Sequence, residues 1–142
     1  TLCLRDLLRE QRDDSDDKLW EMLQEVGLQE RVRALPEQLD TQIRLGGEPF
    51  NKGERKLLAL ARSLLRQPSA LLLDELLVGI PEEAHADLLA LIQRQKCTSV
   101  LVASQESELE IADTIVLLED GTIRCRGKLG SPGLERDVFD LD

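Results

Sequence analysis

Aromatic residues are scarce in this chain of 142 residues. They make up 2% of it, with no tyrosine, and the large rings are Trp20, Phe50 and Phe139. Hydrophobic residues still reach 42%, so we expect a core built from Leu, Ile, Val and Ala. The length suffices for one domain with a single core.

An excess of positive charge is also missing. Eighteen Lys and Arg stand against 28 Asp and Glu, for a net charge of -10. A nucleic-acid-binding protein needs a basic surface to neutralise phosphates, so that class of partner is excluded. Anionic lipid surfaces are disfavoured for the same reason. The ordinary interpretation of the acids is a solvated surface that keeps a Leu-rich domain soluble.

Cysteine and histidine are too few and too scattered for a metal or disulfide framework. The chain holds Cys3, Cys97 and Cys125, no C-x-x-C pair and the single His85, for which we expect a surface or packing role. This pattern favours a reducing compartment. No apolar run approaches the roughly 20 residues that span a bilayer. We expect no signal peptide, and because the chain starts at Thr1 we expect it to be a piece of a longer protein.

The pattern along the chain predicts helices first and then strands alternating with helices. Gly, Pro and capping residues bound each expected element. The expected helices are 16–27, 29–35, 53–66, 81–94 and 106–112, and the expected strands are 70–73, 99–103, 114–118 and 122–125. The last two strands form a hairpin at Asp120-Gly121. Strands that alternate with helices predict an α/β fold with a parallel sheet covered on both faces, and we expect Leu72 and Leu101 in adjacent, fully buried strands.

One short motif carries possible chemistry. The apolar run Leu71-Leu72-Leu73 ends in Asp74-Glu75, which places two carboxylates at the carboxyl edge of a strand, where ligands bind in open α/β sheets. In a nucleotide site the first acid can hold Mg²⁺ through water, and the second can polarise an attacking water. Without further context, a buried strand that runs into an acidic turn is the favoured explanation, by roughly two to one.

Two flanking blocks supply that context. The first runs from Phe50 to Pro68 (FNKGERKLLALARSLLRQP), and the second from Ile111 to Ile123 (IADTIVLLEDGTI). Together with Asp74-Glu75, they resemble, in the right order, the signature helix, Walker B strand and closing hairpin of ABC ATPases. The helix over 16–27 and the segment before Gly46-Gly47 resemble exporters, closest to the multidrug-resistance-associated subfamily.

The resemblance covers about residues 1–130. It implies a P-loop NTPase-type parallel sheet, of which only the second half is present, with an α-helical subdomain. We expect the helical subdomain over 1–66, the C-terminal half of the ATPase core over 67–130 and a tail over 131–142.

Site residues follow from the same resemblance. Asn51, Lys52, Gly53 and Glu54 occupy the nucleotide-binding signature, although Asn51 replaces a serine and the cap of a helix explains it equally well. Asp74 would hold Mg²⁺ through water and Glu75 would serve as catalytic base. Ser104 stands at the position of the switch histidine, and serine cannot carry a proton to the γ-phosphate at neutral pH. The D-loop is also eroded, with Pro81 in place of its acid, and Leu45 replaces an acid that exporters use near their membrane domain.

The phosphate-binding loop G-x-x-x-x-G-K-[ST] is not found in the chain. The nearest segment, Gly121 to Lys128, has one residue too many between its glycines, Leu129 in place of a hydroxyl, and a place on a hairpin. We therefore expect no ATP hydrolysis by this chain alone.

The resemblance implies part of an ABC transporter nucleotide-binding domain, with ATP and Mg²⁺ as cofactors. Its partners would be a second nucleotide-binding domain and the transmembrane domains, at the cytoplasmic face of a membrane. Three alternatives stay open: a working ATPase, a nucleotide-binding partner with weak or no hydrolysis, and a pseudo-ATPase domain kept as a structural or regulatory module.

Overall fold

The computed structural model describes residues 2–139, which fall into two compact units. The first unit comprises Thr1–Leu71 and Gly79–Ser99, and the second comprises Leu72–Val78 and Val100–Asp142. The boundaries after Leu71 and Ser99 fall within strands β3 (Ala70–Asp74) and β4 (Thr98–Val102), so each unit is described by itself. The subdomain boundaries expected at residues 66 and 130 stay predictions.

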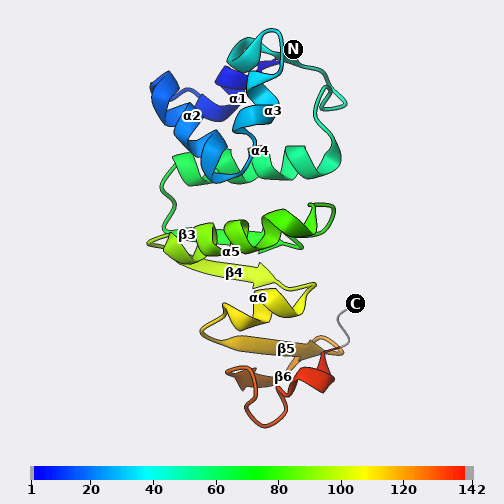
Figure 1. The fold of residues 1–142 in the computed structure, drawn as a ribbon. Coiled ribbons are helices and arrows are strands. Elements are labelled where there is room, and N and C mark those ends of the chain that lie inside the picture. The colour runs from blue at the N-terminus through cyan, green and yellow to red at the C-terminus, as the bar shows by residue number, and fades with distance from the viewer. Residues whose placement is uncertain (1, 140–142) are drawn as a thin grey trace. The chain divides into compact units, whose positions relative to one another are not determined.

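The first unit is mainly helical (Figure 1). Its elements are β1 (Leu2–Cys3), α1 (Leu4–Arg9), α2 (Asp16–Glu25), α3 (Gln29–Arg33), a 3-10 turn η1 (Gln38–Asp40), β2 (Gln42–Ile43), α4 (Lys52–Leu65), the 3-10 turn η2 (Glu82–Ala84) and α5 (His85–Arg94). Strands β1 and β2 pair antiparallel, with Leu2 opposite Ile43. Four of the five expected helices belong to this unit. Helices α2, α3 and α5 lie within their expected ranges, and α4 begins one residue earlier than expected, whereas α1 was not expected.

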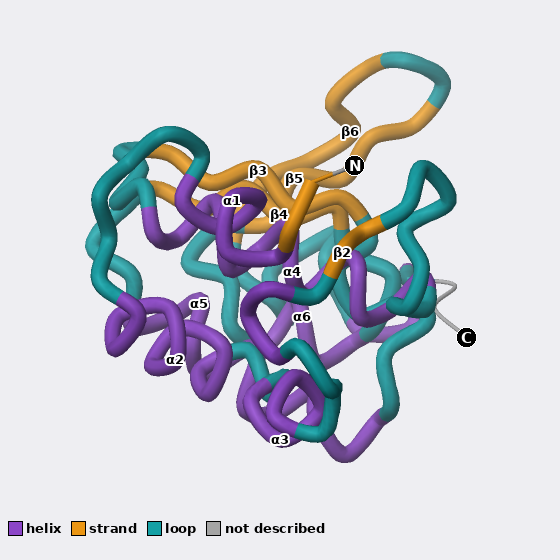
Figure 2. The backbone as a smooth tube through the Cα atoms, turned by 90° about the horizontal axis from the view of Figure 1, so that it is seen from above, coloured by secondary structure: helices purple, strands orange, loops and turns teal. Residues whose placement is uncertain are grey.

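The second unit contains the hairpin. It holds α6 (Glu106–Glu110), β5 (Ile115–Glu119), β6 (Thr122–Gly127) and the 3-10 turn η3 (Arg136–Val138). Strands β5 and β6 pair antiparallel, and Figure 2 draws both in the strand colour. Asp120 and Gly121 join them with φ angles of 48° and 76°, as a tight hairpin turn requires. The hairpin expected from the sequence is confirmed.

Strands β3 (Ala70–Asp74) and β4 (Thr98–Val102) form the parallel pair that the alternating pattern predicted. The Thr98 amide donates to the Ser69 carbonyl at 3.2 Å, and the Glu75 amide donates to the Val102 carbonyl at 3.2 Å. Residue numbers rise together along both strands, so the strands run in the same direction. The chain is therefore α/β, with a small parallel sheet and flanking helices.

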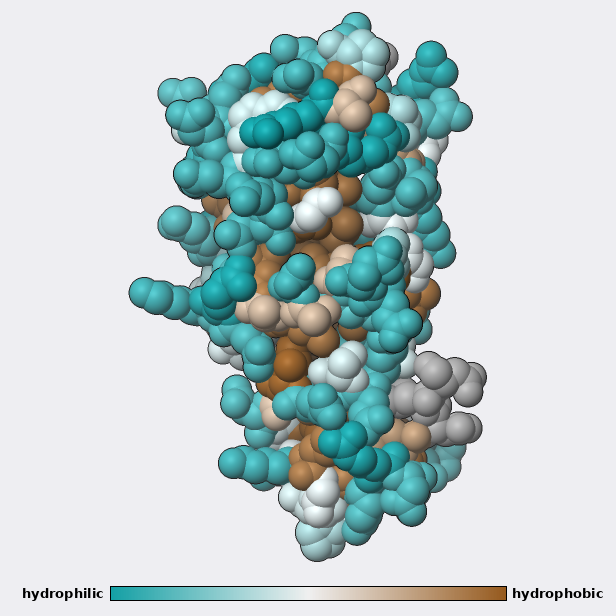
Figure 3. Space-filling view, viewed as in Figure 1, coloured by the Kyte–Doolittle hydropathy of each residue, from teal (hydrophilic) through white to brown (hydrophobic). Residues whose placement is uncertain are grey.

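The core of the first unit is made of leucines, as the composition predicted. Leu4 and Leu8 on α1 and Leu19 and Leu23 on α2 are fully buried, and both helices pack against α4. Each pair is four residues apart, which places its two side chains on one helical face. Charged and other hydrophilic side chains cover much of the face shown in Figure 3, in keeping with the acidic composition.

One expectation about burial is wrong. Leu71 is buried, but Leu72 is 77% exposed, and Leu101 is only partly buried. Successive side chains of a strand point to opposite faces, so an apolar run is buried throughout only when both faces are covered. Along β3 and β4 one face is covered, while Leu72, Val100 and Val102 remain exposed on alternate positions.

Candidate functional site

Asn51 begins α4 as its N-cap. Its Oδ1 accepts from the Glu54 amide at 2.9 Å, and Glu54 Oε2 accepts from the Asn51 amide at 2.8 Å, which completes a capping box. Arg31 Nε donates to the other oxygen of Glu54 at 2.9 Å. The helix-cap interpretation of Asn51 is thus confirmed. The cap uses only Oδ1, which leaves the amino group of Asn51 as a donor.

Gly53 is buried beside the segment that follows β3. A Cβ atom on Gly53 would lie well under 3.0 Å from the carbonyl oxygen of Gly79. Gly79 itself has a φ of 81°, a conformation that residues with a side chain rarely adopt. The close approach at Gly53 and the backbone conformation at Gly79 therefore both require glycine. Lys52, next to them, is exposed at the positive end of the helix, where an anion is favoured.

His85 holds the same turn from its other end. Its Nε2–H donates to the carbonyl of Ile80 at 2.8 Å, because a carbonyl can only accept, and the ring is buried. This geometry supports the packing role expected for His85. Sequence inspection missed the contact with Ile80, because a histidine that binds a backbone carbonyl five residues away leaves no recognisable sequence pattern.

Asp74 and Glu75 emerge at the carboxyl end of β3, in the second unit. Asp74 and Glu75 are both exposed, and Glu75 has a left-handed φ of 46°. Within residues 2–139, no three acidic, His or Cys side chains gather closely enough to hold a metal ion. Mg²⁺ is commonly held by one or two carboxylates together with water and substrate phosphates, so an exposed Asp74 fits that ion as one ligand among several.

Ser104 is bound to Glu108, a residue that the sequence analysis missed. Glu108 Oε2 accepts from the Ser104 amide at 2.7 Å, from the Ser104 hydroxyl at 3.3 Å and from the Gln105 amide at 3.1 Å. The side chain of Glu108 is only 2% exposed, and its Oε1 has no partner among the described residues. Gln105 and Glu108 form the capping box of α6, and their spacing was the signal that could have revealed the contact.

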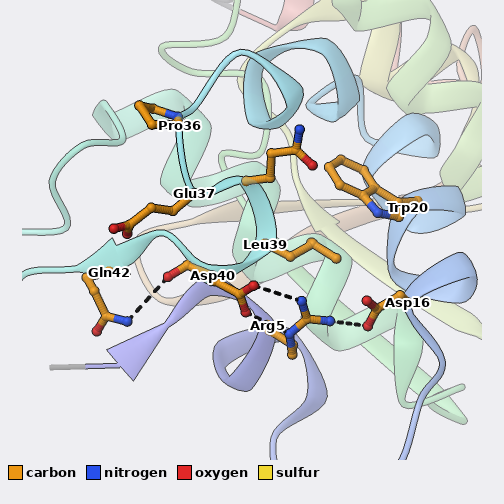
Figure 4. A pocket seen from close by; sticks show the side chains of 9 residues that line it. Arg5, Asp16, Trp20, Pro36, Glu37, Leu39, Asp40 and Gln42 are labelled. Carbon is orange, nitrogen blue, oxygen red and sulfur yellow. Dashed lines mark hydrogen bonds and ion pairs between the residues drawn. The ribbon is translucent and has the colours of Figure 1, made fainter.

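A wide polar hollow lies on the helical unit, away from these residues in sequence (Figure 4). Its volume is about 630 Å³, and Arg5 lies in it between Asp16 and Asp40. The hydrogen bonds that Arg5 donates to Asp40 and Asp16 hold the pKa of Arg5 above its ordinary value, and Arg5 lowers the pKa of Asp40. These charges satisfy one another, so the hollow by itself indicates no ligand.

The predicted site residues thus form two groups. Asn51, Lys52, Gly53 and Glu54 begin α4 in the first unit. Asp74, Glu75 and Ser104 follow paired parallel strands in the second unit, where the Glu75 amide donates to the Val102 carbonyl. Paired parallel strands with acids at their carboxyl edge and flanking helices fit the second half of a P-loop NTPase-type α/β domain.

Comparisons with known proteins give the family. The chain is 33% identical over 126 residues to ABC transporter C family member 3 of Dictyostelium discoideum, covering 84% of this chain and 9% of that protein. It is 32% identical over 113 residues to human ATP-binding cassette sub-family C member 4, and the match covers 78% of this chain and 8% of that protein. It is also 34% identical over 119 residues to the glutathione/L-cysteine transport system ATP-binding/permease protein CydC of Haemophilus influenzae. That match covers 82% of this chain and 21% of that protein. No protein-family model matches the chain.

The fold agrees. A bacterial Atm1-family ABC exporter solved with ATP bound superposes with a TM-score of 0.81 at 22% identity, over 89% of this chain and 23% of that one. The chain belongs to the ABC transporter family and corresponds to the C-terminal part of its nucleotide-binding domain. It spans between 8% and 21% of the length of these curated relatives. Among the helices of residues 2–139, none has the length and apolar character to cross a membrane.

Proposed function

We propose that this chain is part of a nucleotide-binding domain that binds ATP at a head-to-tail domain interface and drives or regulates transport, with weak or no hydrolysis at its own site. The observation that carries the proposal is the Ser104–Glu108 contact. Where relatives of this family place a switch histidine, the hydroxyl and the amide of Ser104 both donate to a buried carboxylate.

This contact bears on hydrolysis for two reasons. Serine has no group that gains or loses a proton near neutral pH, so it cannot replace a histidine in proton transfer. Its hydroxyl hydrogen is also directed to Glu108 and not outward. Asp74 would still hold Mg²⁺ through water, and Glu75 would still orient a water for attack on the terminal phosphate. The catalytic base would therefore be present, whereas the proton-transfer group that a histidine supplies at position 104 would be absent.

The signature residues would serve the nucleotide of a second domain. The amino group of Asn51, the ammonium group of Lys52 and the backbone of Gly53 can approach a phosphate at the positive end of α4. Glu54 would act by holding this loop in shape, because both of its carboxylate oxygens bind within the chain. The second nucleotide-binding domain and the transmembrane domains would place the chain at the cytoplasmic face of a membrane.

A pseudo-ATPase module kept for structural or regulatory interactions is the second candidate. Pro81 favours it, because it stands where the D-loop of the family has an acid and begins η2 without a side-chain cap. In that case the domain would bind no nucleotide, and the packing of Gly53 against Gly79 would serve only the fold.

The full-length protein allows a direct test. We expect saturable ATP binding, Mg²⁺-dependent hydrolysis near background and nucleotide-dependent pairing of two domains. Glu75→Gln should leave binding intact. Lys52→Glu should weaken pairing several-fold, because it puts an acid at the start of α4, while Lys96→Glu makes the same change at an exposed position after α5. A parent protein that binds no ATP would support the pseudo-ATPase module instead.

A further inference from the structure

Helix α4 is positively charged in an acidic chain. Its fourteen residues contain Lys52, Arg55, Lys56 and Arg62 but a single acid, Glu54, whose carboxylate is occupied by Arg31 and the helix cap. The chain as a whole carries a net charge of -10. At physiological salt, charges are screened beyond about 8 Å, so a partner at this helix would meet its local positive charge more than the overall negative charge.

Two of these arginines border an apolar pocket. Arg55 and Arg62 are about two helical turns apart on one face of α4, with Leu58 and Ala59 between them. All four line a pocket of about 160 Å³, together with apolar side chains from α1, β2 and the loop before α4: Leu7, Ile43 and Phe50. Leu58 and Phe50 are buried, whereas Ala59 and Arg55 are exposed, so the pocket opens to the surface.

The pocket is built and not a chance gap between flexible side chains. Arg55 Nη1 donates to the carbonyl of Gly46, and a Cβ atom on Gly47 would collide with the Arg55 side chain. The loop is held further by the Gly47 amide, which donates to the Arg44 carbonyl at 2.8 Å. Glycine at position 47 thus permits the position that Arg55 takes at the rim.

The charges at this rim have no acidic partner within the described part of the chain. Arg5, Arg9, Arg12 and Arg31 of the same unit each form an ion pair with an Asp or Glu. Neither Arg55 nor Arg62 forms one with any acid among residues 2–139. An unpaired cation beside an apolar pocket is complementary to a ligand that is apolar at one end and anionic at the other.

The size of the pocket decides between ligand classes. Pockets for whole small molecules usually enclose about 300–1,000 Å³, whereas about 150 Å³ holds a group the size of benzene. The pocket therefore suits one side chain of a larger partner. Apolar surface continues beside it, because Leu2 pairs with Ile43 and is 45% exposed, and Leu45, two residues further along, is fully exposed.

We propose that this pocket on α4 is a docking site for a polypeptide segment of a partner protein that presents a leucine-sized apolar side chain next to a carboxylate. The apolar side chain occupies the space over Leu58 and Phe50, and the carboxylate pairs with Arg62 or Arg55. This interaction is independent of the nucleotide contacts proposed above, since it uses the side of α4 and not its first residues.

Peptide binding to the purified protein tests the proposal. The probe is the capped dipeptide acetyl-Leu-Glu-amide, compared with acetyl-Leu-Gln-amide and acetyl-Leu-Lys-amide, and binding is followed by the amide NMR shifts of α4. We expect the Glu peptide to bind at least fivefold more tightly than the Lys peptide and to shift Leu58 and Ala59. Arg62→Gln should remove this preference, and Arg62→Lys should retain most of it. Arg94→Gln, which removes a cation paired elsewhere with Glu25, should change nothing.

A steric variant separates docking from general charge attraction. Ala59→Glu puts a larger, acidic side chain at the exposed edge of the pocket, and we expect it to abolish binding of acetyl-Leu-Glu-amide while the circular dichroism of the helices stays unchanged. Equal binding of the Glu and Lys peptides would overturn the proposal. So would peptide shifts that persist in folded Ala59→Glu.

Discussion

Gly53 and Gly79 approach so closely that a Cβ atom on Gly53 would fall well under 3.0 Å from the Gly79 carbonyl oxygen. The first residues of α4 and the segment that begins at Gly79 are therefore packed against each other within the first unit. A change in the backbone conformation of one segment is therefore expected to displace the other.

Replacing Gly53 with alanine should destabilise the protein by about 1–3 kcal/mol, because the backbone of Gly79 cannot yield as a flexible side chain would. Denaturant unfolding measures the loss. Gly46→Ala is the matched control, since a Cβ atom at Gly46 meets nothing within 4 Å and should cost little. Equal stability of the two variants would contradict the packing described here.

Glu108→Ala should destabilise the protein by about 1–3 kcal/mol. The substitution leaves the amides of Ser104 and Gln105 without their shared acceptor in a partly buried place. Glu110→Ala serves for comparison, because it removes only an exposed ion pair with Arg136 and should cost less than about 1 kcal/mol. Both variants can be compared by thermal unfolding. A smaller loss for Glu108→Ala than for Glu110→Ala would show that the Ser104 contact does not hold the segment.

Ser104→His in the full-length protein should raise ATP turnover by about 10²-fold over a slow parent, because a positioned proton-transfer group contributes at least that much. The backbone amide at position 104 can still bind Glu108, which would then lie beside the new imidazole. Steady-state phosphate release measures the change. Ser107→His, on the short helix that follows Ser104, should have no effect. If the parent binds ATP and Ser104→His does not increase turnover, the missing histidine is not what limits hydrolysis.

The stability of the helical unit should fall in acid through Asp14. Lys18 Nζ lies 2.6 Å from Asp14 Oδ1 and Arg12 lies 2.8 Å from Oδ2, and these partners, Lys18 first, lower the pKa of Asp14. The unfolded chain then binds the proton more tightly than the folded one. The stabilisation is thus present above the unfolded pKa of about 3.9 and is lost as the pH falls through the lower folded value.

Asp14→Asn should cost about 1 kcal/mol at pH 7 and progressively less toward pH 2. Thermal unfolding across this range measures the difference from the parent. Asp13→Asn is the control, because Asp13 is exposed and forms no ion pair with the described residues. A cost for Asp14→Asn that stays constant with pH would refute the assignment of the acid sensitivity to this residue.

The elements that depend on neighbouring residues were predictable. Ser15 caps α2 by accepting from the Lys18 amide at 3.4 Å, Pro68 follows α4, and Asp120-Gly121 turns the hairpin. Each of these features is decided within a few residues, by a side chain that reaches a nearby amide or by the conformations open to Gly and Pro. For the same reason the order of strands, helices and acids sufficed to indicate the family.

Features that depend on packing against segments distant in the sequence were not predictable. Helix α1, at the start of the chain, carries no cap from Ser, Thr, Asp or Asn and is stabilised by packing against α4. Leu134, within the segment expected to be a tail, is completely buried against Leu109 and Ile115. The apolar run of β3 predicted burial on both faces, yet Leu72 is exposed because only one face of that strand is covered.

The amino-acid sequence by itself determined the local elements, the α/β class and the family of this protein. It also predicted that Asp74 ends a strand. Only the tertiary structure decided that Gly53 meets Gly79, that Ser104 is bound to a buried Glu108, and that Arg55 and Arg62 border an apolar pocket. A capping side chain needs only its own helix, whereas close approach, burial and unpaired charge depend on residues that folding brings from elsewhere in the chain.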